Sequence, residues 1–160
     1  MSPGQAAVTA ATLVTVASYA VLSARWVSAE PGWYEGLRKP PWQPPPWVFG
    51  VVWPLNFLAL DVAGSVIGVS RPVAESAVFL VVLAVSVVLA LAWAWSFYVP
   101  HDLGAAALFL GGAAVLTWVL VVVAVTAVPW AGWVLLPYAV WLSVAASLSI
   151  GYWRLTASPS

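Results

Sequence analysis

The chain has 160 residues, of which 64% are hydrophobic and 6% are charged, and its mean hydropathy is +1.01. A soluble domain carries about 25% charged residues, so this composition excludes an ordinary soluble domain and a disordered chain and predicts an integral membrane protein. Five basic and five acidic residues leave no basic patch that would bind a nucleic acid. With no cysteine and one histidine, disulfides, iron–sulfur clusters and zinc sites of the Cys/His type are also excluded.

Five stretches are long and apolar enough to cross a bilayer, which takes about 20 residues of helix. In chain order they are residues 6–24, 47–69, 76–99, 104–128 and 130–152. The predicted fold class is therefore all-α, with residues 1–160 forming one membrane domain of five transmembrane helices. The first stretch lacks a basic segment before it and a small-residue cleavage site after it, so we expect a retained helix and not a cleaved signal peptide.

The distribution of basic residues predicts the orientation, because Lys and Arg concentrate on the cytoplasmic side. In a five-helix topology one side holds Arg25, Arg38, Lys39 and Arg154, and the other holds Arg71. We therefore expect the N-terminus outside, and the C-terminus and the first loop in the cytoplasm.

The only long connection, residues 25–46, is rich in proline and aromatic residues. Polyproline geometry keeps such a segment stiff, and because both ends are tied to helices it can fold back as a lid over the mouth of the bundle. Seven of the twelve tryptophans lie near predicted helix ends, where aromatic belts anchor membrane proteins. The five inside predicted helices are Trp53, Trp93, Trp95, Trp118 and Trp141. Buried indoles need a partner for the N–H group, so these indicate either helix packing or an aromatic-lined pocket.

Two helical faces carry most of the candidate pocket residues. Residues at spacings of three and four share one face of a helix. The first such face comprises Trp53, Asn56, Phe57, Leu60 and Asp61. The second comprises Pro137, Trp141, Ala145 and Ser149. The small side chain of Ala145 leaves room beside Trp141 for a flat ligand.

Asp61 is an ionisable residue near the middle of the second predicted helix. A charged carboxylate at the centre of a bilayer is costly, so Asp61 should be protonated, paired or exposed to a cavity. Two interpretations follow. Asp61 is a functional group, or it is a neutral carboxyl hydrogen-bonded to a neighbouring helix through Ser86 or Thr117.

One dense pattern runs through the long loop into the second predicted helix. It reads Trp33-Tyr34, Leu37, Lys39-Pro40, Trp42, Pro44-Pro45, Trp47, Phe49 and Trp53. A second pattern near the C-terminus reads Leu136-Pro137-Tyr138, Trp141, Ala145 and Leu148-Ser149, and Trp95-Ser96 adds a third element. Together they resemble the signature of the TspO/MBR family, the tryptophan-rich sensory proteins and translocator proteins. The chain departs from that signature at Ala92, where the family usually carries Asn, and at Phe97-Tyr98, where an expected aromatic pair is shifted or lost.

The resemblance implies a five-helix bundle, usually dimeric, whose first loop covers a pocket that opens on the cytoplasmic side. Members of the family bind porphyrins, and many bind sterols and drugs of the benzodiazepine-receptor type. The positions that match the family pocket are Tyr34, Trp53, Phe57, Trp141 and Ala145. No tightly bound cofactor is expected. Porphyrin is the expected ligand, held by stacking, because His101 is the only histidine and is expected to be a solvated turn residue.

Several further residues carry two interpretations each. Arg38 and Lys39 either meet the carboxylates of a porphyrin or simply anchor the loop at the membrane surface. Leu148, Tyr152 and Arg154 fit a proposed cholesterol pattern, or they form an interfacial anchor at the end of the last helix. The small residues of Ala107-x-x-x-Gly111 permit a close helix approach, either in a homodimer or within the bundle.

Three functions share the pocket that the sequence predicts. The first is a membrane receptor or transporter for porphyrins and other flat hydrophobic ligands, with a sensory or regulatory role. The second is an enzyme that degrades porphyrin with light and oxygen, using Trp53 and Trp141. The third is a passive carrier of tetrapyrroles or lipids. The expected partners are the lipid bilayer, porphyrin-type or sterol-type small molecules and a second copy of the chain.

Overall fold

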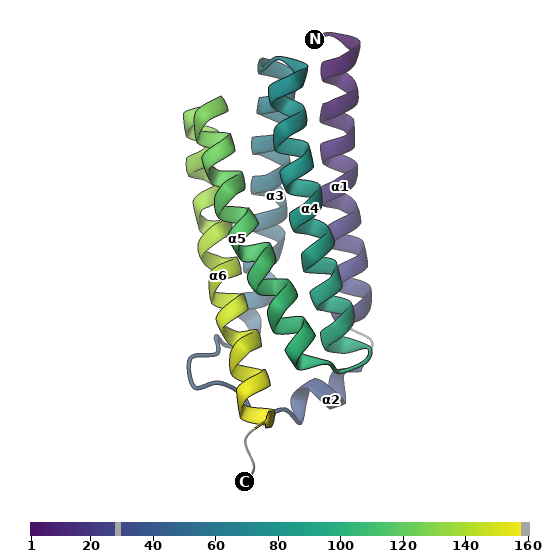
Figure 1. Cartoon of the computed structure of the whole chain (residues 1–160), viewed down its shortest axis with the longest axis vertical. Coiled ribbons are helices and arrows are strands. Elements are labelled where there is room, and N and C mark those ends of the chain that lie inside the picture. The colour runs from purple at the N-terminus through teal and green to yellow at the C-terminus, as the bar shows by residue number, and fades with distance from the viewer. Residues whose placement is uncertain (28–29, 158–160) are drawn as a thin grey trace.

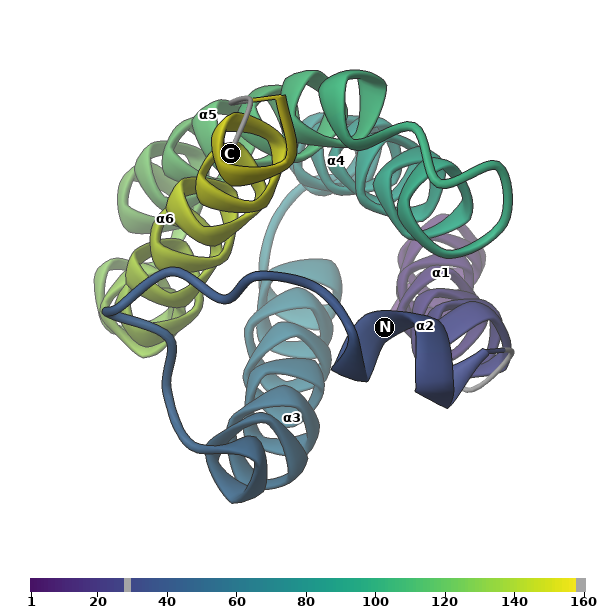
Figure 2. The ribbon, with the colours of Figure 1, turned by 90° about the horizontal axis from the view of Figure 1, so that it is seen from below.

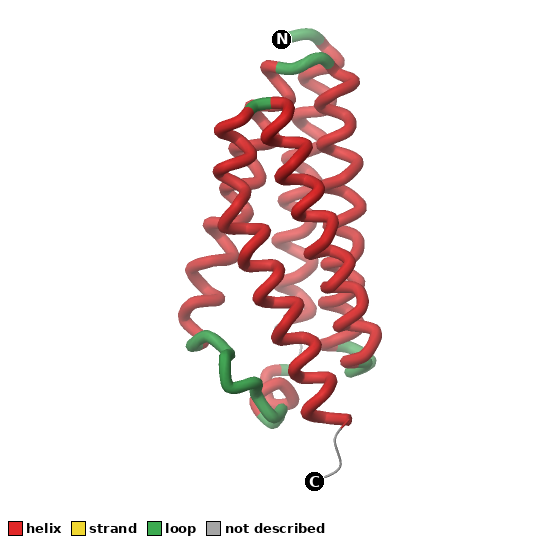
Figure 3. Tube along the Cα trace, turned by 60° about the vertical axis from the view of Figure 1, so that its left-hand side comes forward, coloured by secondary structure: helices red, strands yellow, loops and turns green. Residues whose placement is uncertain are grey.

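The computed structural model describes residues 1–27 and 30–157, and within these residues all regular secondary structure is helical (Figures 1 and 3). The helices are α1 (Pro3–Val27), α2 (Pro31–Glu35), α3 (Pro46–Ser70), α4 (Val73–Tyr98), α5 (Leu103–Ala127) and α6 (Pro129–Ala157). All except α2 are long and apolar enough to cross a membrane. The predicted class, an all-α membrane bundle with five spans, is confirmed. Part of the predicted loop, residues 28–29, lies outside the described residues.

Proline and aspartate define where several helices begin. Pro46 and Pro129 are the first residues of α3 and α6, positions that suit proline because the first N–H of a helix has no partner within it. The carboxylate of Asp102 caps α5 by accepting a hydrogen bond of 2.9 Å from the amide of Ala105. His101, immediately before this cap, has a φ of 59°. This left-handed backbone conformation lies in the short turn between α4 and α5.

Helix α1 packs against α3 and α4, α5 lies between α4 and α6, and α3 also contacts α6. The crossing of α1 and α3 is close, because a Cβ on Gly64 or Gly68 would collide with Thr12 or Thr9. Glycine at a helix crossing lets two backbones approach in this way. The α1 helix is therefore held in the bundle by this close packing on α3 together with its contact with α4.

The two ends of the bundle differ in the chain terminus and the connecting segments that lie there. The N-terminus lies at the opposite end from the C-terminus, and the C-terminus shares its end with α2 and the α4–α5 turn (Figure 1). We use the term lid for residues 30–45, which include α2. Seen along the bundle, the lid crosses this end from α1 to α6 and returns to α3 (Figure 2). The lid therefore covers the end of the space between these helices.

The tryptophans inside the spans fall into two groups. Trp95 and Trp118 are exposed on the outside of the bundle, and the indole N–H of Trp118 donates to Ser143 Oγ at 3.0 Å. Trp53 and Trp93 are partly buried and pack against the core. Trp53 and Trp93 thus fit the alternatives that the sequence left open, whereas Trp95 and Trp118, which face outward, fit neither helix packing nor a pocket.

Of the two interpretations of Asp61, the hydrogen bond to Ser86 or Thr117 is wrong. The hydroxyl oxygens of Ser86 and Thr117 lie 3.3 Å from each other, and Thr117 donates to the carbonyl of Ala113 at 2.9 Å. Both residues belong to the contact between α4 and α5, whereas Asp61 lies on α3, which has few contacts with α5. One carboxylate oxygen of Asp61 is buried without a hydrogen-bond partner.

Candidate ligand cavity

A cavity of about 530 Å³ lies at the lid end of the bundle, between α1, α3, α4, α6 and the lid. Ligand-binding pockets for small organic molecules span about 300–1,000 Å³, so its size suits such a ligand. The aromatic residues in its wall are Tyr19, Tyr34, Phe49, Trp53, Phe57, Trp93, Phe97, Tyr98 and Tyr152. The wall is therefore suited to contact with a flat apolar molecule.

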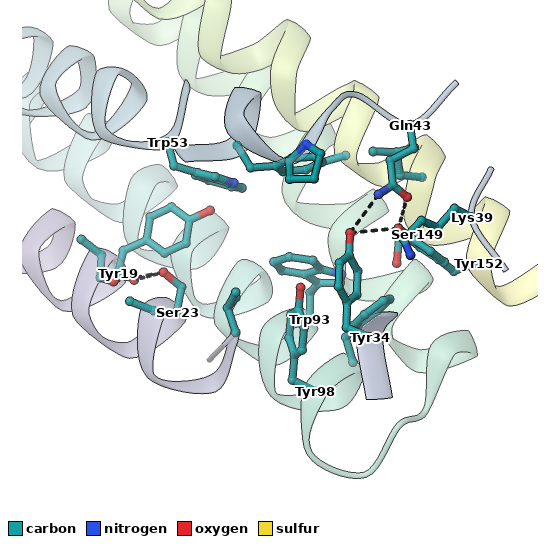
Figure 4. Close-up of a pocket in the computed structure, with 18 of the residues that line it drawn as sticks. Tyr19, Ser23, Tyr34, Lys39, Gln43, Trp53, Trp93, Tyr98, Ser149 and Tyr152 are labelled. Atoms are coloured by element: carbon teal, nitrogen blue, oxygen red, sulfur yellow. Dashed lines mark hydrogen bonds between the residues drawn. The ribbon is translucent and has the colours of Figure 1, made fainter. Parts of the chain in front are cut away.

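The deep end of the cavity is an aromatic cluster between α1 and α3 (Figure 4). Tyr19 meets the ring of Phe57 edge-on at 5.1 Å between centroids and the ring of Trp53 at 6.0 Å. Trp53 and Phe57 stack at 5.8 Å with an angle of 30° between their planes. Such edge and offset contacts add to the stability that burial alone provides, so these rings form a fixed surface against which another ring can pack.

A second aromatic cluster, near the lid, centres on Phe97. Its ring lies 4.8 Å from Tyr98, 5.5 Å from Tyr152 and 5.4 Å from Trp33. These residues come from α4, α6 and the lid. The sequence suggested that the aromatic pair after Trp95-Ser96 was shifted or lost, but both Phe97 and Tyr98 line the cavity.

Three polar side chains close a ring of hydrogen bonds at the lid end (Figure 4). The amide nitrogen of Gln43 donates to the hydroxyl of Tyr34 at 3.1 Å, and the hydroxyl of Tyr152 donates to the amide oxygen of Gln43. The Tyr34 and Tyr152 hydroxyls lie 3.0 Å apart. Because the hydrogen of Tyr152 is directed to Gln43, Tyr34 is the donor in this third bond. We call these residues the polar ring, in which each residue donates once and accepts once.

The lid is also attached to α6 through Pro40 and Trp42. The indole N–H of Trp42 donates to Ser147 Oγ at 3.2 Å. Pro40 is buried, and a Cβ built on Gly151 would lie 2.6 Å from Pro40 Cγ. Position 151 thus requires glycine for the lid to lie this close to α6.

At its other end the lid meets the α4–α5 turn. The ring of Trp33 stacks on that of His101 with centroids 3.8 Å apart and an angle of 16° between planes. The carboxylate of Glu30 lies 3.5 Å from His101 Nε2. The sequence predicted a solvated turn residue at His101. Its side chain instead contacts the lid, through Trp33 and Glu30.

Most of the residues that the sequence assigned to a pocket lie in the cavity wall. They are Tyr34, Trp53, Phe57, Ala145 and Lys39, together with Leu148 and Tyr152 of the cholesterol pattern. The ammonium group of Lys39 donates to the carbonyl of Glu35 at 3.0 Å and lies 5.7 Å from the ring centre of Tyr34.

The other assigned residues lie outside the described wall of the cavity. Trp141 lies behind it, with its ring 5.4 Å from that of Phe49, which lines the cavity. Asn56 is buried, whereas Arg38 and Arg154 are exposed. Asp61 shares the helix of Trp53 but not its contact with the cavity.

The sequence did not identify the contribution of α1, which places Tyr19, Ser23 and Ala24 in the wall. No motif marks this helix, and only an isolated Tyr and Ser in an apolar stretch could have indicated an inward face. Gln43 was also missed, since a single glutamine in a proline-rich loop has no distinctive pattern. Phe49 and Trp93 belonged to patterns that the sequence singled out without assigning them to the pocket.

The side chains of the cavity wall are suited to stacking contacts and hydrogen bonds. Aromatic faces dominate its deep part, and the polar ring and Lys39 lie at its lid end. Among the described residues there is no group of three or more His, Cys, Asp or Glu side chains that could hold a metal ion. The wall thus offers apolar contact at one end and hydrogen bonding at the other.

Comparison with known proteins finds a match over almost the whole chain. The model of the TspO/MBR family matches residues 7–154. Protein CrtK of Rhodobacter capsulatus is 33% identical over 128 residues, covering 77% of this chain and 78% of that protein. The translocator protein of Sus scrofa is 35% identical, covering 76% of this chain and 73% of that protein. The tryptophan-rich protein TspO of Chlorobaculum tepidum is 31% identical, covering 73% and 75%.

Proposed function

Because this chain belongs to the TspO/MBR family, we propose that it is a membrane receptor or transporter that binds porphyrins and other flat hydrophobic molecules in the cavity under the lid. The observation that carries this proposal is the aromatic wall of the cavity, to which four of the five long helices and the lid contribute. A planar macrocycle gains contact area by packing against rings that are already fixed in place.

The polarity of the cavity supports an orientation for the ligand. Trp53 and Phe57 at the deep end favour the macrocycle. Lys39 at the lid end favours a carboxylate, because an ammonium group forms a charge-assisted hydrogen bond with it. A porphyrin with propionate groups would then place them toward the lid. A sterol, if it binds, would occupy the same space, because Leu148 and Tyr152 face the cavity.

A titration of the purified protein in lipid nanodiscs tests the proposal. We expect protoporphyrin to quench the intrinsic tryptophan fluorescence with a saturable, 1:1 dependence on concentration. Trp53→Leu removes a stacking surface and should weaken binding by about tenfold, since aromatic contacts are worth about 1–1.5 kcal/mol beyond burial. Trp95→Leu is the matched control, because Trp95 is exposed on the outside of the bundle. Quenching that does not saturate would contradict the proposal.

Degradation of porphyrin by light and oxygen is a second candidate function, favoured by the oxidisable indole of Trp53 in the cavity wall. Illumination of the complex in air should then bleach the porphyrin more slowly in Trp53→Phe than in wild type. Trp141→Phe should bleach at a rate closer to wild type, because Trp141 is not among the described residues of the cavity wall. Equal bleaching rates in all three proteins would show that these indoles do not degrade the porphyrin and that the protein only binds it.

We also propose that the chain forms a homodimer through the outer face of α5. A Cβ on Gly111 would meet no atom within 4 Å, so this part of the helix is open to a neighbouring molecule. Ala107 is buried within the bundle and takes part in internal packing instead. Native mass spectrometry of the wild type and of Gly111→Leu would test this, with loss of the dimer expected for the variant.

A further inference from the structure

His101 adopts a backbone conformation in which glycine is the favoured residue. Its φ of 59° lies in the left-handed region, where a side chain costs free energy. The backbone around it is fixed, because the amide of Asp102 donates to the carbonyl of Ser96 at 2.9 Å and the amide of Leu103 donates to the carbonyl of His101 at 3.1 Å. A glycine would form this turn at lower cost. The turn alone therefore does not explain the imidazole side chain.

The imidazole of His101 contacts the lid in two ways. Its ring is nearly parallel to that of Trp33, with centroids 3.8 Å apart, and its Nε2 atom lies 3.5 Å from the carboxylate of Glu30. This second distance is longer than that of a direct hydrogen bond, so a neutral imidazole gains little from Glu30. A proton on the imidazole strengthens both contacts. A positive charge over the face of an indole is attracted by the ring, and the carboxylate then meets an opposite charge.

Trp33 connects this contact with the cavity. Its ring meets that of Phe97 at 5.4 Å between centroids and an angle of 77°, and Phe97 lines the cavity. Tyr34, the next residue in the chain, belongs to the polar ring and also lines the cavity (Figure 4). A change in how firmly His101 holds Trp33 therefore acts on the part of the lid that forms the cavity wall.

The charged groups at this end of the bundle affect how the imidazole responds to pH. Glu30 of the lid faces it, and Asp102 follows it in the chain, where its carboxylate caps α5. Arg25 and Arg154 belong to the last turns of α1 and α6, at the same end. The side chains of His101 and Glu30 are 31% and 60% exposed, so solvent protons reach them and water weakens their attraction. The expected effect of protonation is therefore modest.

We propose that His101 is a pH-dependent switch that holds the lid, because its protonated imidazolium binds Trp33 and Glu30 more tightly than the neutral imidazole does. An imidazole takes up a proton between about pH 5 and pH 8. The additional attraction is present after acidification and is lost as the pH rises, so the lid opens more often and the ligand exchanges faster at the higher pH. The ligand exchange rests on the proposed function, whereas the movement of the lid does not.

The position of the lid without ligand is the first readout. The chain has no cysteine, so spin labels can be placed at Gly36→Cys in the lid and at Leu108→Cys on α5, both exposed positions. Double electron–electron resonance in nanodiscs then gives the distances between the labels at about pH 5.5 and pH 8, a range in which ordinary carboxylates remain ionised. The second readout is the dissociation rate of zinc etioporphyrin, which has no group that titrates in this range.

Three variants separate the proton from the contact. His101→Phe keeps an aromatic ring beside Trp33 but cannot be protonated, and Glu30→Gln removes the carboxylate. Glu75→Gln is the matched control, because Glu75 pairs with Arg71 at the opposite end of the bundle.

In wild type we expect the lid-open population and the dissociation rate each to be about three- to fivefold higher at pH 8 than at pH 5.5, the range for a charge over an aromatic ring at a partly exposed site. His101→Phe should abolish this dependence, Glu30→Gln should reduce it, and Glu75→Gln should retain it. Because His101 is the only histidine, its imidazole NMR signals can be followed without ambiguity and should titrate with the same midpoint as the lid.

A lid population that does not change with pH in wild type would contradict the inference. An equal pH dependence in His101→Phe would also contradict it, and so would opening of the lid on acidification. If circular dichroism shows that His101→Phe does not fold, an undiminished response in Glu30→Gln would overturn the inference instead. Porphyrin binding without pH dependence would leave the proposed function intact. A lid that responds to pH in a protein that binds no porphyrin would contradict the proposed function alone.

Discussion

At the scale of single residues, the tryptophans of this chain differ by what their N–H groups meet. Trp42 and Trp118 each donate to a serine hydroxyl, and Trp42 thereby fastens the lid to α6. The N–H groups of Trp93 and Trp141 are buried without a partner. Only Trp93 of this pair faces the cavity. The same residue type thus lies on the outer surface, attaches the lid or lines the cavity, according to where its helix or loop places it.

Asp61 is expected to reduce stability without serving the cavity. One of its carboxylate oxygens is buried without a partner, and the residue does not line the described cavity. We expect Asp61→Leu to raise the free energy of unfolding in a bilayer by about 2 kcal/mol, because it removes an acid from the middle of a span. Denaturation in mixed micelles measures this change. Loss of porphyrin binding in this variant, with the fold retained, would instead show that Asp61 is functional.

The hydroxyl of Tyr34 is expected to control how fast a ligand leaves. Tyr34→Phe removes two of the three hydrogen bonds in the polar ring but retains the aromatic surface. We expect the dissociation rate of protoporphyrin to rise about fivefold, consistent with about 1 kcal/mol from a weakened lid contact. Stopped-flow transfer to empty vesicles measures this rate. Tyr98→Phe is the control, since Tyr98 lines the cavity outside the ring; an equal effect there would contradict the role of the ring.

At the scale of elements, the lid is held at two places by different chemistry. Toward α1 it stacks Trp33 on His101, in the turn between α4 and α5. Toward α3 it places Pro40 against Gly151 of α6. Since proline limits the conformations of the segment between them, displacement at either contact should move the lid as a stiff unit. We therefore expect the lid to regulate access to the cavity.

Gly151→Ala tests the contact between the lid and α6. The added methyl group would meet Pro40, and neither the proline ring nor the helix backbone can yield easily. We expect the lid to separate from α6, so that trypsin cleaves after Arg38 at least tenfold faster and porphyrin binds about tenfold more weakly. Gly50→Ala on α3 is the matched control, because its methyl group would enter open space. Unchanged cleavage in Gly151→Ala would contradict this account of the lid.

The elements were more predictable from the sequence than the cavity wall. Long apolar runs bounded by proline indicate transmembrane helices directly, and the first residues of α3 and α6 are prolines. Tyr34, Trp53, Phe57 and Ala145 were identifiable because they belong to dense motifs. The α1 residues in the wall were not, because tertiary packing alone decides which side of a uniformly apolar helix faces inward. Trp141 shows the same limit, since it packs against Phe49 of another helix and is not among the described wall residues.

At the scale of the whole molecule, the bundle has two unlike ends. The lid, the α4–α5 turn and the C-terminus share one end, and the N-terminus lies at the other (Figure 1). Arg25, Arg38, Lys39 and Arg154 belong to the lid end, and Arg71 belongs to the opposite end. From this bias of basic residues we propose that the mouth of the cavity faces the cytoplasm.

Reporter fusions at the C-terminus test this orientation. We expect a green fluorescent protein fused after Ser160 to be fluorescent, and alkaline phosphatase fused at the same place to be inactive, because the phosphatase needs an oxidising compartment. A second pair of fusions placed before Met1 should show the reverse. Active phosphatase at the C-terminus would contradict the orientation but not the cavity.

The central claim is that the space under the lid is where a porphyrin binds, and filling that space tests it most directly. Ala145 lines the cavity on α6, whereas Val140 is exposed on the outside of the same helix. We expect Ala145→Phe to abolish saturable protoporphyrin binding in nanodiscs, with the helical circular dichroism spectrum unchanged, and Val140→Phe to bind as wild type does. Wild-type affinity in Ala145→Phe would contradict the claim and place the porphyrin elsewhere.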